Sequence, residues 1–266
     1  VPGVVVVAEE PAGGVGSASG HGGGCPVYGL NSTFLQLTCD RRSQDLCINN
    51  NPAVICVCAA SVWGMNDVTH LGLFDIPLLS NIPNMVYLAP TSKEEYFAML
   101  RWGMQQTDHP VAIRVPGNGV ISSNVPVDTD YSDLNRYKTT QQADTVAIIA
   151  AASFYALGES VADLLHKQEG ITPTLINPRY LTGIDEAMLD GLKKNHRLVV
   201  TLEDGVLDGG FGEKIARYYG PCNMKVSNYG VRKEFVDRYD ISELLAANRL
   251  TAPQIVEDIA SLLHQA

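Results

Sequence analysis

The sequence has 266 residues, of which 45% are hydrophobic and 18% are charged, and its formal net charge is −10. This length and composition predict a globular chain of two domains of ordinary size. The acidic charge argues against nucleic acid or an anionic membrane as the main partner, and no apolar run is long enough to cross a bilayer. The six cysteines contain no Cys-x-x-Cys pair, so we expect reduced thiols in a cytoplasmic protein, and no metal site.

The first half of the chain alternates predicted strands and helices. A helix is expected after Ser32 or Thr33, either of which could cap it. Ser92 and Glu95 fit a capping box for a second helix, whose apolar face would carry Phe97, Leu100 and Met104. The predicted strands are residues 4–7, 27–30, 53–59, 84–88 and 111–115.

A polar stretch separates this half from a second α/β unit. We therefore predict a domain over residues 1–120, a linker over 121–142 and a second domain over 143–266. The predicted strands of the second unit are residues 145–151, 174–176 and 198–202, and its helices lie near residues 156–167, 186–194, 212–219 and 253–263. This alternation predicts an α/β fold of two doubly wound, mainly parallel sheets.

Two candidate residues follow predicted strands of the first domain. Glu9 comes directly after an apolar strand, at the edge of the sheet where α/β proteins bind ligands, although it could equally begin a helix and favour the helix dipole. Phe34 also follows a strand and could stack on a flat heterocycle, or it could simply be helix core.

Two further candidates carry polar or charged groups. His70 lies in a polar loop between glycines, where an imidazole suits acid/base chemistry, although a loop histidine bonded to backbone is an equal alternative. Arg114 ends a buried strand and could bind phosphate or carboxylate in bidentate fashion, or it could form a structural ion pair.

In their order along the chain, these segments resemble the 1-deoxy-D-xylulose-5-phosphate synthases, a family of transketolase-type enzymes that use thiamine diphosphate. The resemblance covers nearly the whole chain and corresponds to the pyrimidine-binding and C-terminal domains of that family. The motifs that carry it are Ser32-Thr33-Phe34-Leu35-Gln36, Thr69-His70-Leu71-Gly72, Asn81-Ile82-Pro83-Asn84-Met85-Val86, Arg114-Val115-Pro116, Leu202-Glu203-Asp204-Gly205 and Gly209-Gly210-Phe211-Gly212.

The resemblance implies a reaction and a role for each candidate. The family transfers a two-carbon unit from pyruvate to glyceraldehyde 3-phosphate, and the cofactor carries the reactive carbon. By position, Glu9 is expected to contact the cofactor's pyrimidine ring, and Phe34 to lie against that ring. His70 is expected to be an acid/base group that also contacts substrate, and Asn66 and Arg114 are expected to bind substrate.

The family's cofactor site is also expected to need more than this chain. Its Gly-Asp-Gly…Asn motif, which holds Mg²⁺ and the diphosphate, does not occur in residues 1–266. The sequence therefore looks like a fragment, a processed product or one subunit of a split enzyme. We expect it to require a diphosphate-binding domain or partner chain and to form a homodimer or larger assembly.

Five positions depart from the family pattern and keep two alternatives open. One is a subunit of another transketolase-type or 2-oxoacid dehydrogenase-type enzyme acting on a different aldehyde, and the other is a degenerate relative without catalytic activity. The departures are Pro11, Asn31, Leu37, Ala59 and Asn66.

Overall fold

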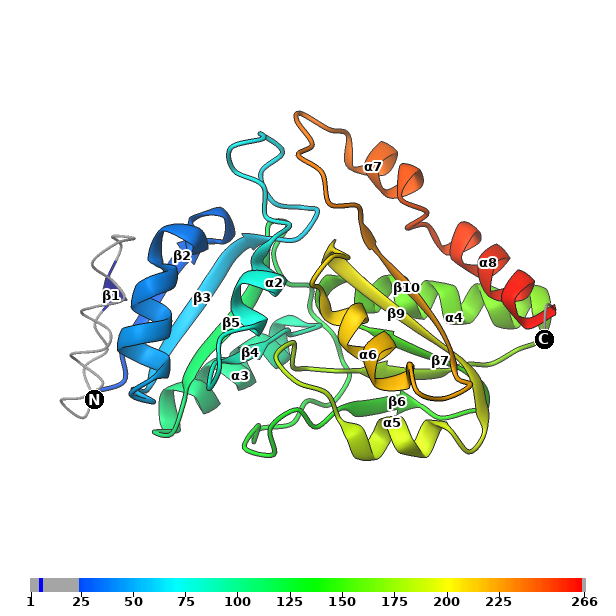
Figure 1. Ribbon diagram of the computed structural model, residues 1–266, viewed down its shortest axis with the longest axis horizontal. Helices are drawn as coiled ribbons and strands as arrows, with labels where there is room; N and C mark the ends of the chain where they lie inside the picture. The colour runs from blue at the N-terminus through cyan, green and yellow to red at the C-terminus, as the bar shows by residue number, and fades with distance from the viewer. Residues whose placement is uncertain (1–4, 7–23, 265–266) are drawn as a thin grey trace.

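The computed structural model describes residues 5–6 and 24–264, which form two α/β domains side by side (Figure 1). The first domain is built on a parallel sheet of order β1-β2-β3-β5-β4. Its strands are β1 (Val5–Val6), β2 (Val27–Asn31), β3 (Ala53–Ala60), β4 (Val86–Leu88) and β5 (Pro110–Pro116). Its helical segments are the 3₁₀-helix η1 (Ser32–Thr38), the π-helix η2 (Arg41–Cys47), α2 (Asp75–Ser80) and α3 (Lys93–Gln105).

The second domain has a sheet of order β10-β9-β7-β8-β6, in which only β6 is antiparallel to its neighbour. The two predicted doubly wound, mainly parallel sheets are therefore confirmed. Its strands are β6 (Lys138–Gln141), β7 (Thr145–Ala150), β8 (Thr174–Asn177), β9 (His196–Val206) and β10 (Lys225–Val231). Its helices are η3 (Ala152–Phe154), α4 (Tyr155–Glu169), α5 (Glu186–Leu192), α6 (Phe211–Tyr219), α7 (Ile241–Ala247) and α8 (Ala252–His264).

Strand β6 lies inside the range 121–142 that the sequence predicts to be a linker. Its residues Lys138 and Gln141 are only partly buried, and the two threonines between them are exposed, so the strand has none of the apolar alternation that marks a half-buried strand. Pairing with β8 holds this polar segment at the edge of the sheet. The domain boundaries stay a prediction.

The capping box at α3 forms only in part. Ser92 Oγ accepts the backbone N–H of Glu95 at 3.2 Å, as predicted. The Glu95 carboxylate instead accepts the backbone N–H of Thr91 at 2.8 Å and the side-chain amide of Asn177 in β8 at 3.0 Å. Glu95 therefore bonds both to the start of its own helix and to the second domain.

The predicted apolar face of α3 is wrong. Phe97 and Met104 are 43% and 42% exposed, whereas the helix buries Met99 and Trp102 against the sheet. Gly103 allows the helix to bury this face. It lies so close to Val54 and Val111 that a larger side chain would crowd them. Packing against the strands thus overrides the distribution of large apolar residues.

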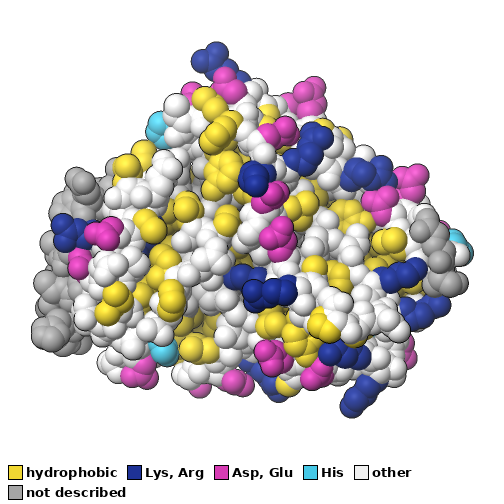
Figure 2. Space-filling view, viewed as in Figure 1, with side chains coloured by type: hydrophobic (Ala, Val, Ile, Leu, Met, Phe, Trp, Pro, Cys, Tyr) yellow, Lys and Arg dark blue, Asp and Glu magenta, His cyan; other side chains and the backbone are white. Residues whose placement is uncertain are grey.

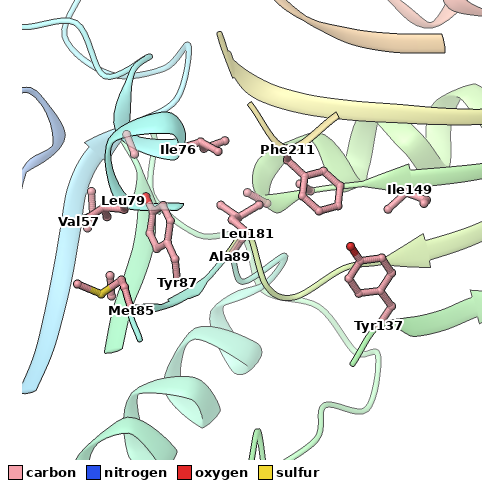
Figure 3. Packing of buried hydrophobic residues seen from close by; sticks show 14 of the residues in the cluster. Val57, Ile76, Leu79, Met85, Tyr87, Ala89, Tyr137, Ile149, Leu181 and Phe211 are labelled. Carbon is pink, nitrogen blue, oxygen red and sulfur yellow. The ribbon is translucent and has the colours of Figure 1, made fainter. Parts of the chain in front are cut away.

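The hydrophobic core continues from one domain into the other. Val57, Leu79 and Tyr87 of the first domain belong to the same buried cluster as Ile149 and Phe211 of the second. Figure 3 shows these side chains converging on the space between the two sheets, with Leu181 and Ala89 between them. A shared core of this kind holds the two domains in a defined relative position.

The surface carries both signs of charge. On the face in Figure 2, acidic and basic side chains are interspersed with exposed apolar ones, and no region of that face has a single sign of charge. All six cysteines are free thiols. Among the described residues, no helix is both long and apolar enough to cross a membrane.

Candidate active site

The predicted histidine lies in a loop that we call the histidine loop, residues 61–72, which connects β3 to α2 (Figure 1). The loop is closed at its base, where the backbone N–H of Ser61 donates to the carbonyl of Gly72 at 2.8 Å. Gly72 packs so closely on the Ala59 carbonyl that a Cβ atom at this position would overlap it. A glycine is therefore required for the two ends of the loop to meet.

A short chain of hydrogen bonds orients His70 within this loop. Thr69 Oγ1 donates to Asp67 Oδ1 at 2.6 Å and lies 2.7 Å from His70 Nδ1. The single hydroxyl hydrogen is directed to the charged carboxylate, so the hydroxyl oxygen accepts a hydrogen bond from Nδ1–H. The other ring nitrogen, Nε2, then has no proton in the neutral imidazole and is available as a base.

The Asp67 carboxylate, which fixes this arrangement, stays ionised at neutral pH. The Thr69 hydroxyl and the Thr69 backbone N–H both donate to Asp67, and these bonds hold the pKa of its carboxyl below the usual range. The carboxylate bonds to Thr69, and Thr69 in turn sets the tautomer and orientation of the His70 ring.

The structure brings His70 and Phe34 together. Phe34 is in η1, directly after β2, and its ring centroid lies 5.5 Å from that of His70 in an edge-to-face arrangement. Thr33 Oγ1 adds a hydrogen bond to the carbonyl of Thr69 at 3.2 Å. Because β2 and β3 are parallel neighbours, their carboxyl ends place both rings at the ligand-binding edge of the sheet.

Glu9 lies outside the described residues, but the strand before it does not. Strand β1 pairs in parallel with β2, with Val5 opposite Val27 and Val6 opposite Tyr28. The three strands that precede Glu9, Phe34 and His70 in sequence are therefore consecutive neighbours in one sheet.

Asn66 makes contacts away from Phe34 and His70. Its side-chain amide donates to the carbonyl of Tyr239 at 3.3 Å, and its own carbonyl accepts the backbone N–H of Arg238 at 2.6 Å. Both partners belong to the second domain. These bonds give Asn66 a part in holding the histidine loop, and its predicted contact with substrate stays a prediction.

Arg114 is fully buried and engaged by two carboxylates. Its Nε donates to Asp75 Oδ2 at 2.6 Å and its Nη2 to Asp75 Oδ1 at 3.1 Å, while Nη1 pairs with Asp204 of the second domain. None of the three side chains is exposed to solvent. This geometry favours the structural ion pair over the substrate-binding role, because the guanidinium has no open approach for a ligand.

In this cluster, burial and the neighbouring charges have opposite effects on the pKa values. Burial alone would lower the pKa of Arg114, but Asp204 and Asp75 outweigh it and raise the pKa, so the guanidinium stays charged. Burial raises the pKa of Asp204 against the opposing effect of Arg114. Burial also raises the pKa of Tyr87, whose hydroxyl donates to Asp75.

Glu203 is a second buried acid of the same strand. It accepts the backbone N–H groups of Phe211 and Gly212, both at 2.8 Å, at the start of α6. Burial raises its pKa to about 8, although those two hydrogen bonds lower it in part. Its carboxyl group thus closes the N-terminus of α6 from inside the protein.

Sequence reasoning missed the partners of the predicted residues. Asp75 and Asp204 pair with Arg114, and Asp67 and Thr69 orient His70. The adjacent acids at positions 203 and 204, inside the apolar run of β9, carried a usable signal, since buried carboxylates require partners. No pattern in the sequence indicates which partners they find.

The described residues hold no group of three or more His, Cys, Asp or Glu side chains that could bind a metal ion. Phe34 is partly buried: it packs on the core on one side and meets His70 at its edge. This arrangement fits the aromatic wall of a heterocycle site better than a metal or phosphate site.

Two family models match the chain and together cover most of it. The pyrimidine-binding domain of transketolase matches residues 4–120, and the C-terminal domain of transketolase matches residues 136–255.

Individual relatives support the same family. The chain is 32% identical to a 1-deoxy-D-xylulose-5-phosphate synthase of Shouchella clausii over 98% of its own length and 42% of that protein. It is 31% identical to the enzyme of the same name from Clostridium tetani, over 97% of the chain and 42% of that protein. The chain thus spans less than half the length of these relatives.

Solved structures share the fold. A split-gene transketolase, described as an inactive β4 tetramer, superposes with a TM-score of 0.80 at 22% identity, over 96% of this chain and 82% of that one. A transketolase from Campylobacter jejuni gives a TM-score of 0.73 at 17% identity, over 94% of this chain and 38% of that one. The chain belongs to the transketolase family of thiamine-diphosphate-dependent enzymes, of which it contains the pyrimidine-binding and C-terminal domains.

Proposed function

We propose that this chain supplies the pyrimidine side of a thiamine-diphosphate site in an enzyme that transfers a two-carbon unit from pyruvate to glyceraldehyde 3-phosphate. The observation that carries the proposal is the contact between the Phe34 and His70 rings. They come from segments 36 residues apart in sequence and meet at the carboxyl edge of adjacent strands. The 32% identity to synthases of this activity over nearly the whole chain supports the choice of reaction.

In this proposal Phe34 forms one wall of the site for the cofactor's pyrimidine ring, and Glu9 contacts that ring. When bound, thiamine diphosphate supplies the electron sink for the two-carbon unit. His70 moves protons at the substrate through Nε2, since Thr69 occupies Nδ1. Thr69 and Asp67 position the imidazole, and Asn66 contacts substrate.

The diphosphate and Mg²⁺ are assigned to a further domain or partner chain. This assignment rests on two observations. The sequence lacks the Gly-Asp-Gly…Asn motif, and the chain aligns with only 42% of the Shouchella clausii synthase. A homodimer or larger assembly completes the site, and pyruvate and the aldehyde bind where the parts meet.

The first test is replacement of Glu9 in the protein assembled with its diphosphate-binding part. Glu9→Ala should abolish product formation from pyruvate and glyceraldehyde 3-phosphate. The neighbouring Glu10→Ala is the matched control, because it removes the same charge one position along the chain. Full turnover by Glu9→Ala would contradict the proposed cofactor site.

A second candidate function is that of one subunit of a two-chain transketolase. The departures from the synthase pattern at Leu37 and Ala59 leave the acceptor aldehyde open, and the chain shares its fold with a split-gene transketolase at a TM-score of 0.80. A substrate panel separates the two: pyruvate as donor favours the synthase reading, and ketose phosphates as donors favour transketolase.

A further inference from the structure

The second domain reaches across to the histidine loop through a segment that we call the clamp loop, residues 232–240, between β10 and α7. In Figure 1 this loop rises beside the histidine loop at the top of the molecule. Tyr239 OH donates to the carbonyl of Val62 at 3.0 Å, near the start of the histidine loop. Phe235 packs on Phe74 just after its end, with ring centroids 5.9 Å apart.

Among the clamp-loop contacts, the one made by Asp237 lies nearest to His70 along the chain. Its Oδ1 accepts the backbone N–H of Val68 at 3.2 Å, two residues before the histidine. The adjacent clamp-loop residues bind Asn66 through their backbone, as described above. The turn that presents Asp67, Thr69 and His70 is therefore held on both sides of Asp67 by the second domain.

These contacts supply what the histidine loop lacks by itself. Asn66, Val68 and Thr69 are exposed, and Val68 is 39% exposed although it is apolar. The ends of the loop are buried at Val62 and Leu71, but its exposed middle has few packing contacts of its own to keep one conformation. The external hydrogen bonds from the clamp loop restrict it at the three positions Val62, Asn66 and Val68.

We propose that Asp237 is a positioning residue for His70: by accepting the Val68 N–H it holds the histidine loop in the conformation that presents the imidazole. The C-terminal domain thereby takes part in the reaction without touching substrate. The catalytic consequence rests on the proposed function, whereas the effect on the loop does not.

The test compares Asp237→Ala, Asp237→Asn and the control Glu234→Ala. Glu234 lies on the same clamp loop and pairs only with Arg232 among the ion pairs of the described residues, at 3.4 Å. In the full-length protein, hydrogen exchange of residues 64–72 should be roughly three- to tenfold faster in Asp237→Ala, as expected for the loss of one hydrogen bond. Asp237→Asn should retain most of the protection, because its amide oxygen can still accept the Val68 N–H.

Two further readouts separate positioning from a general loss of structure. The ¹⁵N shifts of His70 should show a smaller share of the Nδ1–H tautomer in Asp237→Ala, because the bond to Thr69 is no longer held in place. In the assembled enzyme kcat should fall about tenfold with KM changed less, as expected for misplacement of a group that acts in the transition state.

The outcomes distinguish failure of this inference from failure of the proposed function. Unchanged exchange and tautomer populations in Asp237→Ala would overturn the inference, and so would an equal effect of Glu234→Ala. If exchange and tautomer change as expected while the wild-type assembly makes no product from pyruvate, the inference stands and the proposed reaction is wrong.

Discussion

Two groups of charged residues lie at the junction of the domains, and they differ in burial, in pairing and in access to solvent. Arg114, Asp75 and Asp204 lie in the shared interior, fully buried and bonded to one another. Asp67 and Asp237 lie at the exposed rim, and each accepts hydrogen bonds from the histidine loop. The buried group has strong mutual attraction and no access for a ligand, whereas the rim group lies beside His70, which is only partly buried.

This difference shows that burial and pairing, not residue type, separate the enclosed charged groups from the accessible ones at this junction. An arginine is the residue type most suited to bind a phosphate, but here two aspartates already occupy its donors. The exposed middle of the histidine loop depends on contacts from the second domain, which suits the substrate-binding role that we propose for it.

The largest expected effect comes from breaking the buried group. Arg114→Met should destabilise the protein by about 3–5 kcal/mol, because it leaves two buried carboxylates without their partner. Urea denaturation measures the change, and Arg41→Ala is the surface control, since its pair with Asp45 should contribute less than about 1 kcal/mol. Unchanged stability combined with weaker binding of a phosphorylated aldehyde would instead support a substrate-binding role for Arg114.

Replacing His70, which lies beside the rim group, should have the opposite signature. His70→Ala should lower kcat by about 10²- to 10⁴-fold through loss of acid/base catalysis, with the free energy of unfolding changed by less than about 1 kcal/mol. Steady-state kinetics and urea denaturation of the same preparation test both parts. His166→Ala is the control, because His166 is exposed on α4 and bonds to Thr172. A large loss of stability in His70→Ala would mean that the histidine is structural.

Glu203 tests the effect of burial in another way, because its buried carboxyl should make the stability of the protein depend on pH. Burial raises its pKa from 4.5 to about 8, so between these values the folded protein retains a proton that the unfolded chain has released. Its contribution to stability therefore decreases as the pH rises through this window, with a slope of at most about 1.4 kcal/mol per pH unit.

Glu203→Gln should remove that part of the slope, which urea denaturation at several pH values between 5 and 9 would measure. Glu257→Gln is the control for loss of a surface carboxylate, which in this case bonds to Arg249. The same slope in Glu203→Gln and in the wild type would show that the folded protein holds Glu203 ionised.

The smallest expected effect concerns a single bond of the clamp loop. Tyr239→Phe removes the hydrogen bond to the Val62 carbonyl and should cost about 0.5–1.5 kcal/mol of stability. Hydrogen exchange near residue 62 should increase. Tyr155→Phe, which removes a hydroxyl bonded to Thr140 elsewhere in the protein, should leave exchange in the histidine loop unchanged.

Several elements could be predicted because their signal is local. Apolar runs identified β2, β3, β5, β7, β8 and the centre of β9, and the Ser92 cap marked the start of α3. The segment after Asn31 was predicted as one helix, but the structure has η1 and η2 instead. Strand β10 and helices α2 and α7 were not predicted. Residues 225–228 of β10 are only partly buried, and α2 and α7 are only 6 and 7 residues long, so each carries a weak periodic signal.

The residues of the candidate site also divide into those that a local pattern predicts and those that it does not. Phe34 could be singled out because it follows a strand, and His70 because it lies in a polar loop between glycines; parallel strands then bring the two to one edge. The function of Asp237 could not be predicted, since it lies 169 residues from Val68 in the sequence and only the docking of the second domain brings the two together.

By itself the sequence determined the class of fold, the family and the residues able to carry chemistry, because strand patterns, motifs and residue types are properties of short segments. Only the tertiary structure decided which of those residues is accessible. Arg114 and His70 are both plausible ligand-binding groups in sequence, yet one is enclosed by Asp75 and Asp204 and the other is presented at the rim. The reason is physical: burial and pairing arise from contacts between segments that are far apart along the chain, and no local pattern records them.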